Sequence, residues 1–139
     1  MASKIERYEK NREIKRTINN SIIIYFVDGD AYINGLKFIN KSSEQQIVLL
    51  QILITNQFQS RLKGIKNTGC TWMELATAID VKRCKGEAVL KHQTSEEHIR
   101  QLIFQIRRKA RKLTASKNFE VIKEAIKSRY ILNEKIVLF

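Results

Sequence analysis

The sequence 94-TSEEHIRQLIFQIRRKARKL-113 decides the fold that we expect for this chain. It opens with two hydroxyl residues followed by two carboxylates, a helix-start signal because hydroxyls cap free backbone N–H groups and acids favour the positive end of the helix dipole. Apolar residues then recur at intervals of three and four, at Ile99, Leu102, Ile103, Ile106, Ala110 and Leu113. This spacing gathers them in a sector about 100° wide, so the pattern predicts a helix over 95–113 with one face packed on a core.

The opposite face of this predicted helix is polar and basic. Its members are Gln101, Phe104, Arg108, Arg111 and Lys112, with Gln105, Arg100 and Glu97 at the flanks. A helix can enter the major groove of DNA, about 12 Å wide, when a core holds one face and the other presents hydrogen-bond donors. The two faces together therefore predict a helix that reads duplex DNA.

Positive charge is concentrated around this helix. The 139-residue chain has 26 Lys and Arg against 14 Asp and Glu, a net charge of +12. Residues 98–129 contain ten basic and two acidic residues, and so hold two thirds of the net charge. Clustered charge of this kind favours a polyanionic partner, whereas dispersed charge only aids solubility.

The segments before this helix predict a small sheet. Residues 21–27 are rich in Ile, Tyr, Phe and Val, and the cluster 28–30 follows them as a turn. Asn34-Gly35, with apolar residues on both sides, predicts a hairpin because both central turn positions need positive φ. We therefore expect antiparallel strands over 21–39.

Two further helices are expected next. A hydroxyl residue three positions before Gln or Glu predicts helix starts at Ser43 and Thr71. The first helix is expected to end at about Asn56 and the second near Asp80, with residues 57–70 as a polar connection between them. Beyond the basic helix, residues 119–126 and 129–133 predict two strands, and residues 136–139 a last edge strand.

Composition places the chain among single-domain proteins. With 43% hydrophobic residues it can build a core, and 139 residues suit one domain. We expect this domain over 21–139, preceded by a charged N-terminal arm or helix over 1–20. The apolar stretches are too short for a membrane span, the first 20 residues do not resemble a secretory signal, and Cys70 and Cys84 predict reduced thiols in a cytoplasmic protein.

Three segments carry a resemblance to a known family. Residues 99–109 resemble the recognition-helix signature of OmpR/PhoB-type regulators, residues 121–130 look like the wing of that family, and residues 46–53 are similar to its first helix. The resemblance implies an α+β fold, a winged helix-turn-helix with N-terminal antiparallel strands, a three-helix core and a C-terminal β-hairpin wing. It also implies a sequence-specific transcriptional regulator of double-stranded DNA, here without a receiver domain, with self-association on DNA and a contact between loop 81–93 and RNA polymerase.

Each candidate DNA-binding residue has an expected role. Arg108 and Arg111 suit guanine, and Gln101 and Gln105 suit adenine, because each can make paired hydrogen bonds to that base. Phe104 has two open roles: contact with a thymine methyl group, or packing against the hairpin or the helix starting at Thr71. The residues expected to bind phosphates and so position the protein are Arg100, Arg107, Lys112, Lys127 and Arg129.

Two other classes of function remain open, and one is disfavoured. A structured-RNA-binding protein would share the phosphate attraction, and a protein-interaction adaptor could use the same scaffold. An enzyme is not expected, because the chain lacks a glycine-rich phosphate loop and a convergent catalytic set. Cys84, His92 and His98 lack the spacing and the fourth partner of a closed zinc site, so no metal or other cofactor is expected.

Overall fold

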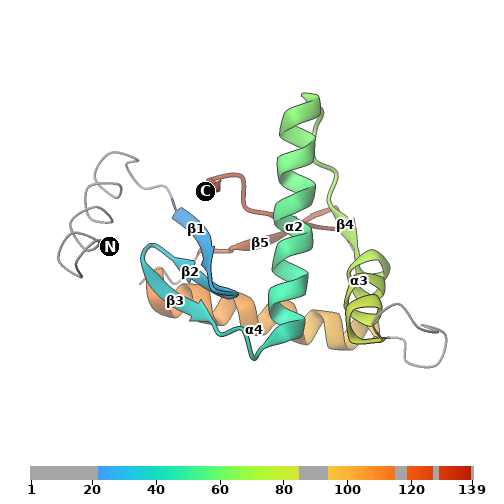
Figure 1. The fold of residues 1–139 in the computed structure, drawn as a ribbon. Helices are drawn as coiled ribbons and strands as arrows, with labels where there is room; N and C mark the ends of the chain where they lie inside the picture. Colours follow the sequence, from blue (N-terminus) through green and yellow to red (C-terminus); the bar gives the residue numbers. More distant parts are fainter. Residues whose placement is uncertain (1–21, 85–93, 115–118, 127–128, 139) are drawn as a thin grey trace.

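The computed structural model describes residues 22–84, 94–114, 119–126 and 129–138, which form a mixed α+β fold of three helices and two small sheets. The helices are α2 (Glu44–Lys63), α3 (Trp72–Cys84) and α4 (Glu96–Thr114). Helix α4 crosses the base of α2, with α3 near its first turn and the first sheet near its other end (Figure 1). The expected arm over 1–20 lies outside the described residues.

The first sheet has the strand order β3-β2-β1-β7. Strands β1 (Ile22–Val27), β2 (Asp30–Ile33) and β3 (Leu36–Ile39) are antiparallel neighbours, which confirms the predicted N-terminal strands. Asn34 and Gly35 have φ values of 50° and 86°, so the hairpin uses the turn geometry that their sequence favours. The Asn34 side-chain oxygen also accepts the Ile23 N–H at 2.9 Å and so anchors the turn to β1.

Strand β7 (Ile136–Leu138) completes the first sheet from the other end of the chain. It pairs in parallel with β1, with Ile22 opposite Ile136 and Ile24 opposite Leu138. The sequence predicts an edge strand over 136–139 but contains no signal for its partner. Pairing with β1 joins the last described residues to the first.

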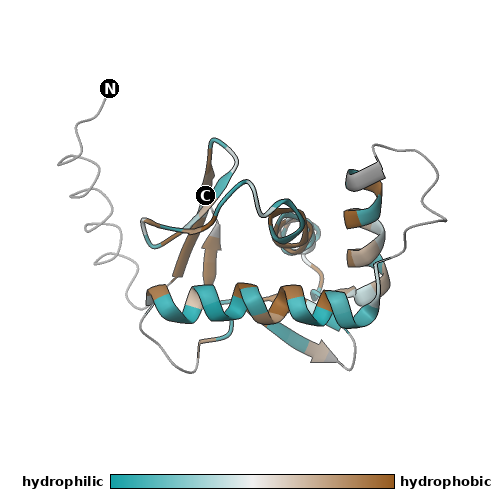
Figure 2. Cartoon of the chain, turned by 90° about the horizontal axis from the view of Figure 1, so that it is seen from below, coloured by the Kyte–Doolittle hydropathy of each residue, from teal (hydrophilic) through white to brown (hydrophobic). Residues whose placement is uncertain are grey.

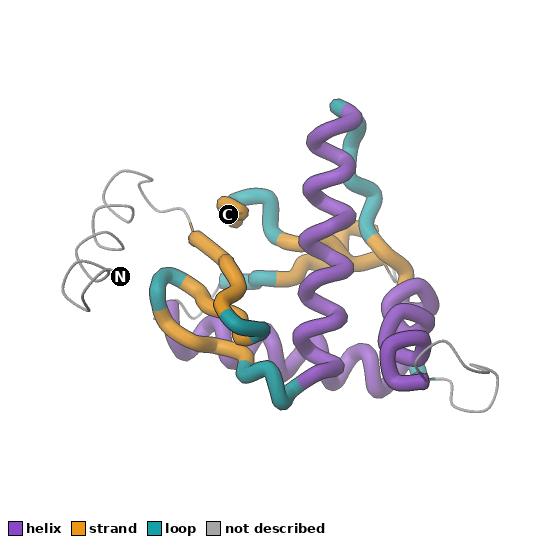
Figure 3. Tube along the Cα trace, in the orientation of Figure 1, coloured by secondary structure: helices purple, strands orange, loops and turns teal. Residues whose placement is uncertain are grey.

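The second sheet has the order β4-β6-β5 and lies behind α2 in the view of Figure 3. Strands β5 (Ile122–Ile126) and β6 (Arg129–Leu132) form the predicted C-terminal antiparallel pair, although β5 begins at Ile122 rather than at Phe119. Strand β4 (Cys70–Thr71), which pairs with β6, was not predicted. It follows Gly69, where φ is +86° and an added Cβ would lie 2.8 Å from the Tyr130 carbonyl oxygen.

Both helices before α4 are longer than predicted. Helix α2 continues past Asn56 to Lys63, where Gly64 adopts the left-handed conformation and closes the helix. Polar residues could extend it because Gln57 and Ser60 are buried and hydrogen-bonded, and the Ser60 hydroxyl donates to the Asn56 carbonyl at 2.9 Å. Helix α3 likewise ends at Cys84 rather than near Asp80.

The three predicted capping signals have different outcomes. The Thr71 hydroxyl accepts the Glu74 N–H at 3.2 Å, and the Ser95 hydroxyl accepts the His98 N–H at 3.1 Å, as a side-chain cap requires. Ser43 is the N-cap residue of α2, as predicted, but its side chain makes no capping hydrogen bond. Its backbone is held in a turn by its N–H bond to the Asn40 carbonyl, with φ and ψ of −83° and 60°.

Candidate nucleic-acid interface

Helix α4 buries the predicted apolar stripe and leaves its other face open. Ile99, Leu102, Ile103, Ile106 and Ala110 are between 0% and 5% exposed, and Leu113 packs at the margin of the core. Figure 2, which views the molecule from below, shows the outer side of α4 in front of the rest of the fold and mostly hydrophilic. The core therefore holds the apolar face of α4, and the polar face of α4 is open to solvent.

A buried carboxylate fixes where α4 begins. Asp80, 2% exposed in α3, accepts the Thr94 backbone N–H at 2.9 Å and the Thr94 hydroxyl at 2.6 Å. Ser95 then caps the first turn of α4. These contacts fix the start of α4 against α3, although residues 85–93 between them lie outside the described residues.

The first turn of α2 fixes one flank of α4 through a line of amide contacts. The Gln45 side-chain oxygen lies 2.6 Å from the His98 ring. The Gln46 side-chain nitrogen donates to the side-chain amide oxygen of Gln105 at 2.8 Å, and the Gln46 side-chain oxygen accepts from the Lys109 ammonium at 2.7 Å. The predicted adenine contact of Gln105 would therefore share its amide oxygen with Gln46. Its amide nitrogen forms no hydrogen bond with a described residue, and the side chain is exposed.

Two arginines expected to bind DNA connect α4 to the segment before and within β5. The Arg107 Nε donates to the Ile122 carbonyl at 2.8 Å, and the Arg111 Nε donates to the Phe119 carbonyl at 3.0 Å. A second nitrogen of Arg111 lies 3.9 Å from the Glu120 carboxylate. Both arginines are partly buried. They hold the β5–β6 hairpin and the residues before it against α4, so they have fewer N–H groups left for DNA than the sequence suggests.

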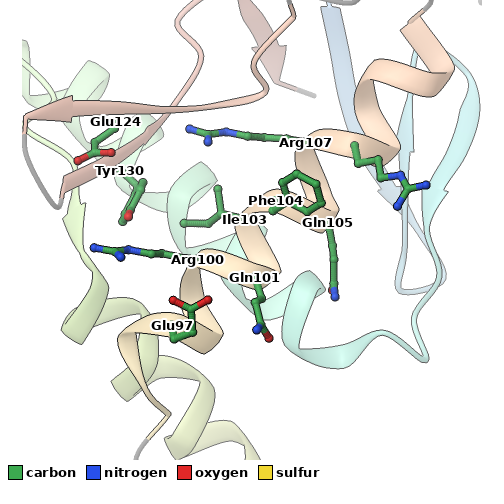
Figure 4. A pocket seen from close by; sticks show the side chains of 10 residues that line it. Glu97, Arg100, Gln101, Ile103, Phe104, Gln105, Arg107, Glu124 and Tyr130 are labelled. Atoms are coloured by element: carbon green, nitrogen blue, oxygen red, sulfur yellow. The ribbon is translucent and has the colours of Figure 1, made fainter.

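An open hollow of about 580 Å³ lies between the outer face of α4 and the β5–β6 pair (Figure 4). Its cationic wall includes Arg100, Arg107 and Arg108, and Glu124 and Tyr130 line the opposite side. Arg100 forms a 3.0 Å ion pair with Glu96. The pKa of the Arg100 guanidinium is raised chiefly by that carboxylate and next by a side-chain hydrogen bond with Tyr130, so both groups stabilise its charge beside the hollow.

Phe104 is the exposed apolar residue of this face. It is 62% exposed and lines the hollow, as do Gln101 and Arg108. The described residues leave most of the ring uncovered, which argues against the packing alternative from the sequence, in which the hairpin or α3 covers it. The reason is geometric, since residue 104 lies on the side of α4 opposite Ile99 and Ile106, which are fully buried.

The remaining predicted residues differ in how far the fold engages them. Gln101, Arg108 and Lys112 are exposed, and no described residue forms a side-chain hydrogen bond or ion pair with them. Arg129 is partly buried and donates to the Gly69 carbonyl at 3.3 Å, so it ties β6 to the residue before β4. Lys127, the other hairpin residue expected to contact phosphate, lies outside the described residues.

No group of three or more His, Cys, Asp or Glu side chains within the described ranges is placed to hold a metal ion. Cys70 is a free, buried thiol whose pKa burial raises to about 11, so it remains protonated and unreactive at neutral pH. None of the helices described has a segment long and apolar enough to cross a bilayer.

Comparisons of the chain with protein-family models, with curated proteins and with solved structures find no match.

Proposed function

We propose that this protein is a sequence-specific regulator that binds double-stranded DNA through the outer face of α4, in a winged helix-turn-helix arrangement. In this proposal α3 and α4 are the helix-turn-helix pair, α4 enters the major groove, and β5–β6 is the wing beside the backbone or minor groove. The order of elements supports it: three helices, an antiparallel pair directly after the third, and β4 between the first two helices pairing with that hairpin. No catalytic step and no cofactor belong to the proposal.

One observation carries the proposal: α4 is pinned to the core along one side while its other side presents unpaired donors. Arg108, Lys112 and Gln101 point to solvent without a partner among the described residues, and the stripe opposite them is fully buried. Unpaired cations on a rigid helix suit phosphates and guanine edges, which are the most common targets of Arg and Lys on duplex DNA.

The fold contacts refine which residue does what. Arg108 and Gln101 are the best placed readers of base edges, because the fold makes no other use of their side chains. Lys112 and Arg100 suit phosphates on either side of the groove. Arg107 and Arg111 act chiefly by holding the hairpin against α4, and their free N–H groups add backbone contacts.

Random-library selection of bound duplexes at physiological salt tests the proposal directly. We expect the wild-type chain to enrich a defined motif. The double variant Arg108→Ala, Lys112→Ala should lose the motif and bind any duplex at least tenfold more weakly, because one readout contact and one phosphate contact are removed. The matched control Lys63→Ala, Lys66→Ala removes the same charge at exposed positions at and just after the far end of α2 and should retain the motif.

Other outcomes of the same selection would contradict the proposal. If both double variants weaken binding equally, the attraction comes from net charge and not from the face of α4. If a hairpin RNA competes better than the selected duplex at equal salt, the structured-RNA alternative replaces the DNA proposal. If neither nucleic acid is bound, the interaction-adaptor alternative takes its place.

A further inference from the structure

The end of α2 farthest from α4 has an apolar patch that faces solvent. Phe58, Leu62 and Ile65, which we name the distal patch, are 54%, 71% and 60% exposed. Phe58 and Leu62 are one helical turn apart on the same side of α2, and Ile65 follows the Gly64 cap. Single exposed apolar residues are common, but a cluster of large ones at one helix end marks a contact surface.

The polarity of α2 is inverted along its length. In the first half, Leu49, Leu50 and Leu53 face the core and are fully buried. In the second half, the inward positions are occupied by the polar residues Gln57 and Ser60, 4% and 8% exposed, while the outward positions carry the distal patch.

Hydrogen bonds satisfy the inward polar groups of the second half. The Ser60 hydroxyl donates to the Asn56 carbonyl at 2.9 Å. With the Gln57 amide turned to the orientation that satisfies both of its ends, its nitrogen donates to the Leu132 carbonyl and its oxygen accepts from Arg61, both at 3.0 Å. By contrast, the fold covers less than half of the surface of Phe58, Leu62 and Ile65. A helix that places polar groups inside and apolar groups outside is arranged for a second molecule.

The charge around the distal patch identifies the partner. Its neighbours in sequence Arg61, Lys63 and Lys66 are exposed, Arg61 with one nitrogen 3.4 Å from the Glu134 carbonyl, and residues 45–69 contain no acidic residue. A second copy in a two-fold dimer would bring these cations against themselves, which disfavours self-association through this surface. An apolar surface with acidic flanks would complement both the patch and its rim.

We propose that the distal patch binds an acidic amphipathic helix of a partner protein. Phe58 and Leu62 form one ridge against which the apolar ridge of such a helix can pack, and the cations at its rim select a carboxylate-rich flank. The end of α2 projects away from α4, as Figures 1 and 3 show, so a partner there leaves the outer face of α4 open. This proposal does not depend on DNA binding.

Fluorescence anisotropy with the full chain tests it. The probe is a labelled helical peptide with leucines at positions i, i+4 and i+7 and glutamates on both flanks, and the comparison peptide has lysines in place of the glutamates. We expect the acidic peptide to bind at least tenfold more tightly than the basic one. The pair Phe58→Ser, Leu62→Ser should weaken its binding at least tenfold, and Lys63→Glu, Lys66→Glu should reverse the preference between peptides.

The matched control is Met73→Ser, Val81→Ser, which removes two exposed apolar residues from α3 and should leave peptide binding unchanged. Equal binding of the two peptides would overturn the charge argument, and an equal loss in the α3 control would overturn the location. Sedimentation that shows a dimer lost in Phe58→Ser, Leu62→Ser would assign the patch to a second copy. Unchanged circular dichroism melting of each variant confirms that the folded chain is being compared.

Discussion

At the scale of single residues, the exposure of Phe104 separates its two possible roles. The Phe104 ring, between Gln101 and Arg108 on the outer face of α4, is mostly exposed in the described fold and lines the hollow beside the β5–β6 hairpin. Within the proposed DNA interface, an exposed aromatic ring suits the methyl group of thymine, which is the one apolar group on a base edge in the major groove.

Phe104 should therefore make the protein sensitive to that methyl group. Replacing the contacted thymine of the selected motif by deoxyuracil removes one buried methyl, worth about 0.8 kcal/mol, so wild-type affinity should fall about fourfold. The Phe104→Ala variant should bind both duplexes equally. Scanning deoxyuracil through each thymine and finding wild-type affinity at every position would exclude this contact.

Asp30 illustrates a charge that serves the fold. Its carboxylate accepts the Lys41 backbone N–H at 2.7 Å and lies 3.3 Å from the Lys37 ammonium. The pKa of Asp30 is lowered, chiefly by the bond from the Lys41 N–H and further by Lys37. The carboxylate thus ties the start of β2 to the chain that leaves β3.

The pH dependence of the free energy of unfolding should reveal the contribution of the Asp30 carboxylate. Because its folded pKa is below its unfolded value, the contribution is complete above about pH 4 and is lost as pH falls through the folded pKa. Urea unfolding of wild type and Asp30→Ala should therefore differ at pH 6, and the difference should shrink below pH 4. A difference that stays constant down to pH 2 would show that another property of the side chain is responsible.

At the scale of elements, the placement of α4 depends on a few polar contacts as well as on its apolar stripe. Asp80 fixes its start, Gln45 and Gln46 hold one flank, and Arg107 and Arg111 hold the segment leading into β5. Apolar packing alone is non-directional, whereas hydrogen bonds of defined length fix the rotation and register of a helix. The outer face of α4 is oriented by these contacts.

Removing the Asp80 carboxylate should destabilise the protein and loosen the start of α4. Asp80→Ala leaves the Thr94 N–H and hydroxyl buried without their acceptor, and we expect a loss of roughly 2–3 kcal/mol in the free energy of unfolding. Denaturant unfolding measures the loss, and amide exchange should show it concentrated in the first turns of α4. Glu134→Ala, which removes an exposed carboxylate paired with Lys123, should change stability by less than about 0.5 kcal/mol.

At the scale of the whole molecule, a net charge of +12 raises affinity for any polyanion, and the geometry decides where that affinity is directed. The outer face of α4 and the hollow beside the hairpin present cations on one side of the fold. The distal patch and its three cations lie at the end of α2 away from α4. We thus propose two surfaces that can be occupied together.

Salt should therefore weaken DNA binding steeply. If about six phosphates are contacted, affinity should fall roughly a thousandfold between 50 and 200 mM salt, because each contact releases a condensed counterion. A gel-shift titration measures the slope, and Arg108→Ala, Lys112→Ala should reduce it by about one phosphate contact, that of Lys112, because Arg108 is proposed to contact a base edge. An affinity that does not change with salt would show that the basic outer face of α4 is not the DNA-binding surface.

Local sequence signals were sufficient to predict structure where a residue's neighbours in sequence are also its neighbours in space. The stripe of α4, the Asn34-Gly35 hairpin, the caps at Thr71 and Ser95 and the C-terminal strand pair were predicted correctly, because 3.6-residue periodicity and turn chemistry depend on adjacent residues. The end of α2 was missed because buried hydrogen bonds of Gln57 and Ser60 stabilise polar residues that read as a loop.

The sequence by itself determined the amphipathic helix, its basic outer face and the concentration of charge around it, since periodicity and composition are written in the chain. Only the tertiary structure decided that Phe104 is exposed, that Arg107 and Arg111 bind backbone carbonyls, and that β7 joins β1 while β4 joins β6. These outcomes depend on contacts between residues far apart in the chain. A residue's exposure and hydrogen-bond partners are set by what the rest of the fold places against it, and no local pattern carries that information.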